Sequence, residues 1–184
     1  MRNLNPADNG AMVANVKKAR DGDADAFAVL YGEIYKDLYR IAFLNLNSEA
    51  DASDAVSDAV VEAFQSLGGL RNPESFKPWF VTILFSKIKK KQREYVRNRQ
   101  NETEIDAYDT ASETADELSR GFSFDTAEVK EAFTQLNPQE RNILSLSAVS
   151  GFKSEEIAKM LRISANTVRS NAARAKEKLR RILT

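Results

Sequence analysis

Apolar residues recur at helical spacing along almost the whole chain, and this periodicity constrains the fold more than any other feature of the sequence. In a helix, positions i, i+3, i+4 and i+7 share one face. The segment 25–42 follows this rule with the apolar residues Phe27, Leu30, Tyr31, Ile34, Leu38, Ile41 and Ala42. Strict alternation of apolar and polar residues over the length of a strand does not occur in the sequence. The sequence therefore predicts an all-α fold.

Four helices are predicted in the N-terminal half. Asp51 or Ser53 is the predicted N-cap of the third, because a short polar side chain can accept a hydrogen bond from the first turn. Pro78 lies in the first turn of the fourth, where its missing N–H costs little. The predicted helices are a short stretch over 13–19, a long one from Asp25 to a break at 45–48, a third ending at Gly68 and Gly69, and a fourth over 75–97.

The segment after the fourth predicted helix differs in composition from the rest of the chain. Residues 101–125 contain eight acidic side chains, one basic side chain and few large apolar ones. Such a segment buries too little apolar surface to order itself. The sequence therefore predicts two small helical bundles joined by a flexible acidic linker: a disordered tip over 1–12, a helical domain over 13–97, the linker over 98–127, and a second helical domain over 128–184.

The chain contains no cysteine and no histidine. Disulfides, thiol nucleophiles, Cys/His zinc sites and histidine-based catalysis are thereby excluded. A carboxylate enzyme remains an alternative, although the sequence has no glycine-rich phosphate loop and no Glu-x-x-His pair. We expect no catalytic residue, no metal and no cofactor. No apolar stretch approaches the ~20 residues of a membrane-spanning helix, and the polar start lacks a secretory signal, so we expect a cytoplasmic protein without membrane insertion.

Charge is segregated along the chain although the net charge is zero. Residues 87–99 contain seven basic side chains against Glu94, and residues 162–181 contain seven against Glu177. Two basic stretches on or beside amphipathic helices are typical of nucleic-acid binding. The alternative is that both stretches only solvate helix faces. Trp79 and Phe80 lie on the apolar stripe of the fourth helix and are predicted to be core rather than base-stacking residues.

The C-terminal residues 128–184 show the spacing of a helix-turn-helix. Ser154 is the predicted N-cap of its first helix, Ser164 caps the second, and Val168 anchors the second helix on the first. Arg162 stands in the turn where glycine is usual, and a left-handed conformation there costs on the order of 1 kcal/mol. The outward side chains of the second helix suit base edges or phosphates; they are Asn166, Thr167, Arg169, Ser170, Arg174, Lys176 and Lys178.

Two parts of the chain resemble one protein family. The run LNPQERNILSLSAVSGFKSEEIAKMLRISANTVRSNAARAKEKLRRIL resembles region 4 of extracytoplasmic-function (ECF) sigma factors almost throughout. The helix over 51–64 and the aromatic entry Phe76 and Trp79 resemble region 2 of the same family. The chain is therefore identified as a somewhat divergent member of the ECF sigma factors of bacterial RNA polymerase, with departures such as Ser57 and Asn171.

The resemblance implies that the chain binds core RNA polymerase through its clamp helices and flap and directs transcription from promoters with −10 and −35 elements. It also implies an anti-sigma partner, as in many relatives. The alternative is a helix-turn-helix regulator that binds operator DNA without polymerase. The implied sites are Asp54, Ser57, Asp58 and Val61 for core polymerase; Leu70, Arg71, Asn72, Lys87, Lys89, Lys90, Lys91 and Arg93 for the −10 element; and the seven helix-turn-helix residues named above for the −35 element.

Overall fold

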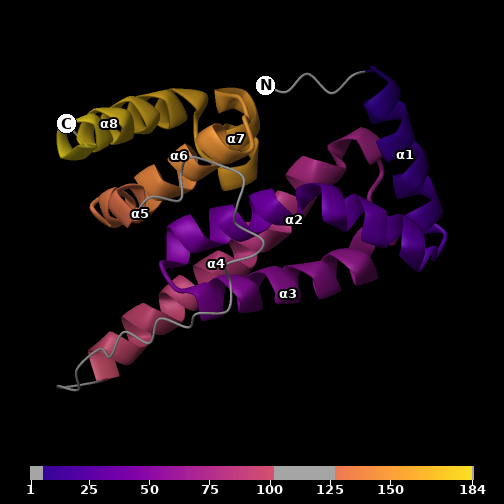
Figure 1. Ribbon diagram of the computed structural model, residues 1–184, viewed down its shortest axis with the longest axis horizontal. Helices are drawn as coiled ribbons and strands as arrows, with labels where there is room; N and C mark the ends of the chain where they lie inside the picture. Colours follow the sequence, from indigo (N-terminus) through magenta and orange to yellow (C-terminus); the bar gives the residue numbers. More distant parts are fainter. Residues whose placement is uncertain (1–5, 102–126, 184) are drawn as a thin grey trace.

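The computed structural model describes residues 6–101 and 127–183, with side chains over 10–98 and 127–183. These ranges are helical and contain no strand (Figure 1). The prediction of an all-α fold is confirmed. The elements are α1 (Pro6–Arg20), α2 (Ala24–Leu46), α3 (Glu49–Ser66), the short 3-10 helices η1 (Leu67–Gly69) and η2 (Pro73–Ser75), α4 (Phe76–Asn101), α5 (Ala127–Thr134), α6 (Pro138–Val149), α7 (Ser154–Leu161) and α8 (Ala165–Leu183).

Helix boundaries depart from the sequence prediction at several places in the N-terminal half. Helix α1 begins at Pro6 rather than near residue 13. The N-cap of α3 is Ser48, whose hydroxyl accepts the Asp51 N–H at 3.2 Å, so the prediction of Asp51 or Ser53 is wrong. The backbone of Ser48 is already extended, which allows the helix to start one residue later at Glu49. The predicted linker between α4 and α5 lies largely outside the described residues.

The helix-turn-helix has the predicted form, with one correction. Lys153, not Ser154, is the N-cap of α7, because Ser154 is already helical; the Lys153 N–H donates to the Glu156 carboxylate at 2.7 Å. Arg162 adopts the predicted left-handed conformation with φ 56° and ψ 47°. Ser164 caps α8 as predicted, its hydroxyl accepting the Thr167 N–H at 3.0 Å.

The two halves of the molecule pack against each other, which the sequence did not predict. Helix α6 lies along α2, and α7 packs on α4 (Figure 1). The main core joins side chains of both halves, among them Leu38, Leu84, Ile143 and Ile157. Leu44 of α2 belongs to a second cluster, with four residues of the C-terminal half: Phe133, Leu136, Leu144 and Ala175. The predicted bundles therefore share apolar cores.

Among the helices that the structure describes, none has both the length and the apolar character that crossing a bilayer requires.

Candidate functional site

Helix α4 presents a basic face to solvent in its second half. Lys89, Lys90 and Arg93 are exposed, whereas the apolar side of the helix, including Phe80, is buried in the core. A shallow groove of roughly 370 Å³ lies along this face, lined by Lys89, Gln92, Arg93, Val96 and Arg97. Closely spaced cations on one helix face can neutralise successive phosphates of a nucleic acid. Of the two aromatic residues predicted to be core, Phe80 is fully buried, and Trp79 is partly buried and packs against the same core.

Two other predicted DNA-binding lysines on α4 face α3 instead. The Lys91 ammonium lies 2.7 Å from Asp51 Oδ1 and 3.1 Å from Asp54 Oδ2. The Lys87 ammonium pairs with Glu62 at 2.5 Å. Both lysines are more buried than their carboxylate partners. They brace α4 against α3, a role that the sequence prediction missed.

The charges of this α3–α4 contact are mutually stabilised. Partial burial works to raise the pKa of the Asp51 carboxyl, but hydrogen bonds from Lys91 and Tyr95 outweigh burial and lower its pKa below the usual value. Burial also works against the charged form of Lys91, yet its hydrogen bonds to Asp51 and Asp54 raise its pKa. The pKa of Tyr95 is raised to about 12, first by burial and then by its hydrogen bond to Asp51. The contact therefore favours the ionised form of Asp51 and the protonated form of Lys91.

In the loop between α3 and α4, two of the three residues predicted to contact DNA are exposed to solvent. Arg71 and Asn72 are exposed, but Leu70 is buried in the core and supports the loop from beneath. The Asn72 side chain accepts the Glu74 N–H at 3.1 Å and caps η2. A Leu70 contact with a ligand would thus require the loop to rearrange.

The outer face of α3 carries the predicted polymerase contacts. Asp54, Ser57, Asp58 and Val61 are all exposed and share one face at i, i+3, i+4 and i+7 spacing. Val61 is 56% exposed. Phe64, one turn further along α3, is 45% exposed and packs edge-on against Phe27. The face therefore combines two carboxylates with apolar surface, and Phe64 enlarges it by a residue that sequence reasoning missed.

The N-terminal part of α8 exposes the predicted base-reading side chains. Asn166, Arg169 and Ser170 are exposed, and Thr167 is half-buried beside its cap. The Arg169 guanidinium donates to Asn166 Oδ1 at 2.9 Å and also pairs with Glu155 of α7. This pairing holds the guanidinium over the start of α8, where a recognition helix presents its side chains to base edges.

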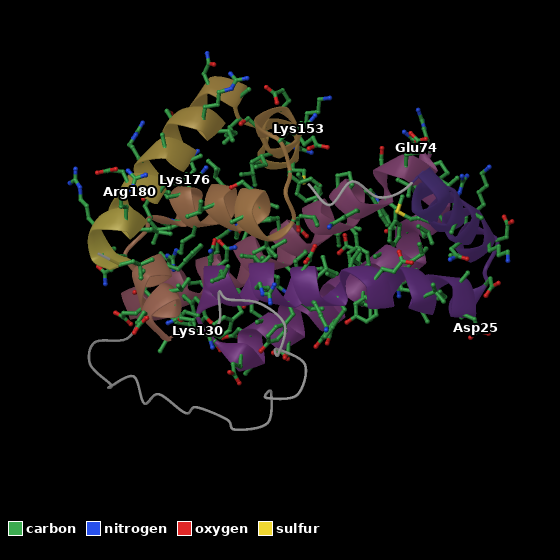
Figure 2. All side chains as sticks on the ribbon, turned by 45° about the horizontal axis from the view of Figure 1, so that its top comes forward. Asp25, Glu74, Lys130, Lys153, Lys176 and Arg180 are labelled. Atoms are coloured by element: carbon green, nitrogen blue, oxygen red, sulfur yellow. The ribbon has the colours of Figure 1, made fainter. Side chains whose placement is uncertain are left out.

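The basic side chains at the end of α8 have two roles. Some point to solvent, and one, Lys178, forms an ion pair with a buried carboxylate. Figure 2 shows Lys176 pointing away from the body of the protein, and Arg174 is likewise exposed. The Lys178 ammonium instead lies 2.8 and 3.0 Å from the carboxylate oxygens of Glu140, which is 1% exposed. Lys178 therefore neutralises a buried charge.

Glu140 is a structural residue that sequence reasoning overlooked. Its carboxylate accepts the Asn137 N–H at 3.1 Å, and the Asn137 side chain accepts the Glu140 N–H at 2.9 Å, so the two form a capping box at the start of α6. Burial works to raise the pKa of Glu140, but the hydrogen bonds from Lys178 and from the backbone of Asn137 lower it overall. The Asn-Pro-x-Glu pattern signals the capping box, while the burial of Glu140 comes from tertiary packing.

Comparison with known proteins gives a consistent result. The family model described as Sigma-70 region 2 matches residues 30–101, and the model described as Sigma-70, region 4 matches residues 126–179. The RNA polymerase sigma factor SigV of Bacillus subtilis (strain 168) is 30% identical over 151 residues, which cover 81% of this chain and 86% of SigV. The ECF RNA polymerase sigma factor SigM of Mycobacterium tuberculosis is 28% identical over 163 residues, which cover 88% of this chain and 79% of SigM.

Two solved structures share the fold. CnrH, in complex with the cytosolic domain of CnrY, superposes with a TM-score of 0.68 at 23% identity, over 94% of this chain and 97% of CnrH. The sigma factor RpoE of Bartonella quintana, in complex with the anti-sigma factor NepR, gives a TM-score of 0.71 at 22% identity, over 85% of this chain and 96% of RpoE.

Proposed function

The chain belongs to the ECF sigma factors of the sigma-70 family, and from this premise we propose which of its surfaces bind RNA polymerase and promoter DNA. As an alternative sigma factor it directs transcription initiation. Sigma factors are DNA-binding initiation factors, so the question for this chain concerns binding surfaces. A polymerase subunit works where polymerase is, and we therefore place its action in the bacterial cytoplasm.

Core polymerase binds the outer face of α3 in this proposal. Asp54 and Asp58 offer two exposed carboxylates, and Val61 supplies apolar area beside them, with Ser57 between. A mixed acidic and apolar face suits a basic helical partner such as the clamp helices, because carboxylates set orientation and the buried apolar centre supplies affinity. The exposed acidic face of α3, with the basic face of α4 on the same half, is the observation that carries the proposal.

The −10 element binds α4 and the loop before it. Lys89, Lys90 and Arg93 meet the backbone phosphates, and Arg71 and Asn72 are the loop contacts. Lys87 and Lys91 are assigned to bracing rather than to DNA, because both ammonium groups are held by α3.

The −35 element binds the start of α8. Asn166, Arg169 and Ser170 face base edges in the major groove, and Arg174 and Lys176 meet the flanking phosphates. Thr167 lies next to these residues, where its N–H donates to the Ser164 cap. Lys178 is not assigned to DNA, because its ammonium pairs with Glu140.

An anti-sigma factor is the proposed regulatory partner. RpoE was solved with the anti-sigma factor NepR, and CnrH with the cytosolic domain of CnrY. The shared fold extends over most of the chain in both cases, which supports a protein partner of the same kind for this one.

Transcription with purified core polymerase tests the proposal. Specific initiation should occur only when this chain is added, and Asp54→Arg combined with Asp58→Arg should remove core association without loss of helical content. Stable operator binding by the chain alone, with no gain from core polymerase, would favour the alternative of a simple regulator. Normal co-purification of the double variant with core would show that α3 is not the docking helix.

A further inference from the structure

Three carboxylates form an acidic stripe along the outer face of α3. Asp54, Asp58 and Glu62 stand at i, i+4 and i+8, so they lie on one side of the helix, and all three are exposed. Within residues 10–98 and 127–183, the Asp58 carboxylate forms no ion pair and accepts no hydrogen bond, whereas each of the other two pairs with a lysine of α4. The three carboxylates are therefore not equally available to a cation from outside.

The Lys91 ammonium is shared by two carboxylates that differ in exposure. It lies 2.7 Å from Asp51 Oδ1 and 3.1 Å from Asp54 Oδ2. The side chain of Asp51 is 27% exposed and also accepts a hydrogen bond from Tyr95, whereas the side chain of Asp54 is 70% exposed. Asp51 can therefore keep the ammonium when a second cation binds Asp54. Asp54 is the exchangeable partner of this lysine.

Lys87 has no second carboxylate to fall back on. Its ammonium lies 2.5 Å from Glu62 Oε2, and among the described residues Glu62 is the only carboxylate that it pairs with. The Lys87 side chain is 22% exposed. If Glu62 turned to an outside cation, this partly buried ammonium would lose its counter-charge, and an unpaired charge that is shielded from water is costly. Glu62 is therefore held by α4 although it is exposed.

A cation on a docking partner meets three different situations along this stripe. At Asp58 it meets a carboxylate with no other partner. At Asp54 it must share the carboxylate with Lys91, whose positive charge repels it at short range. Exposed ion pairs are individually weak, so this competition should reduce the contribution of Asp54 to binding by roughly two- to fivefold in Kd rather than remove it.

We propose that the lysines of α4 grade the polymerase-docking face of α3. Asp58 is the dominant charged contact of this face. Asp54 contributes only in part, because Lys91 competes for it, and Glu62 stays with Lys87 and contributes least. The proposal rests on the proposed function, since it ranks residues on the docking face assigned there. Lys91 thus has a second effect besides bracing α4: it keeps the affinity for core polymerase below the value that the same face would reach without it.

The dissociation constant of the full chain for purified core polymerase tests this ranking. Asp54→Asn, Asp58→Asn and Glu62→Gln each remove one negative charge and keep the shape of the side chain. We expect Kd to rise about tenfold or more for Asp58→Asn, by a factor roughly two to five times smaller for Asp54→Asn, and by less than about twofold for Glu62→Gln. A general charge effect would instead give equal rises for all three variants.

Lys91→Met tests the competition directly. Removal of the ammonium frees Asp54, so Kd should fall roughly two- to fivefold. In this background Asp54→Asn should raise Kd as much as Asp58→Asn does, because the two carboxylates are then equally free. A damaged fold would weaken binding, so a gain in affinity cannot come from lost stability. Lys89→Met is the matched control: it removes the same charge from an exposed lysine without a carboxylate partner among the described residues, and Kd should stay within about twofold.

The outcomes separate this ranking from the proposed function. Equal rises in Kd for the three carboxylate variants, a larger rise for Glu62→Gln than for Asp58→Asn, or unchanged binding by folded Lys91→Met overturns the ranking. Normal binding by all three carboxylate variants, or no binding by the unmodified chain, refutes the docking face of the proposed function instead. If Lys91→Met does not fold, as judged by circular dichroism, the three carboxylate variants decide alone, because they leave both lysines in place.

Discussion

Replacing Lys91 by methionine distinguishes a bracing lysine from a DNA contact. The substitution keeps an unbranched side chain but removes the ammonium that Asp51 and Asp54 share. Hydrogen bonds to charged groups are worth about 1.5–3 kcal/mol when buried, and exposed ion pairs under about 1 kcal/mol. The Lys91 side chain is 19% exposed and that of Asp54 is 70% exposed, so we expect an intermediate loss of ~1–2 kcal/mol in the free energy of unfolding. For a protein of this size the melting temperature should fall by roughly 2–8 °C.

Lys91→Met should lower the stability of the fold but leave the affinity for DNA nearly unchanged. The affinity of the polymerase complex for promoter DNA is measured over a series of salt concentrations for Lys91→Met and for the matched control Lys89→Met, one exposed lysine on the same helix. Loss of one phosphate contact reduces the salt slope by ~0.9 on duplex or ~0.7 on single-stranded DNA. Lys89→Met should show this reduction with little change in stability, and Lys91→Met should show the reverse. A reduced slope and unchanged melting temperature for Lys91→Met would refute the bracing role.

Three further predictions concern α3, α8 and α6. Asp54→Arg with Asp58→Arg should abolish pull-down of core polymerase, whereas Glu33→Arg, an exposed acid on α2, should not; equal loss in both would mean a general charge effect. Arg169→Ala should lower discrimination between −35 sequences by ~1–3 kcal/mol in competition binding, and a uniform loss over all sequences would make Arg169 a phosphate contact. Glu140→Gln should cost about 2 kcal/mol at pH 7, in the range of charge-assisted hydrogen bonds. The pKa of Glu140 is lowered in the folded state, so its stabilisation is present above the unfolded pKa and is lost as pH falls through the folded pKa. The free energies of unfolding of wild type and Glu140→Gln, measured by denaturant titration, should therefore converge at acid pH. A difference in free energy of unfolding that does not change with pH would contradict this.

Most of the candidate site follows from local patterns. The face of Asp54, Ser57, Asp58 and Val61 is a matter of helical spacing, and it is exposed as predicted. The ion pairs of Lys87 and Lys91 with carboxylates of α3 are the part that the sequence analysis did not predict. Both lysines continue the helical face of Phe80, which is buried. That register is a sequence signal that they turn inward, but the identity of their carboxylate partners depends on how α3 lies against α4.

The N-cap of α3 is another feature that local sequence alone does not determine. Ser48, Asp51 and Ser53 are all suitable caps within six residues, and composition alone does not choose among them. The extended backbone at Ser48 decides where α3 starts. Helix α2 ends at Leu46, and its C-cap, Asn47, directly precedes Ser48. Local propensity therefore predicts that a helix begins in this segment and leaves its first residue to the packing of its neighbours.

The sequence by itself determined the helices, the helix-turn-helix with its left-handed Arg162, and the charged faces, because these depend on periodicity and on residues within a few turns of one another. Only the tertiary structure decided that Leu44 lies in the core of the other half, that Asn45 meets Ser145, and that Lys178 serves the buried Glu140. Each of these contacts joins residues 38 to 100 or more positions apart. No periodicity encodes which distant faces meet, since that choice depends on the shape and polarity of both surfaces at once.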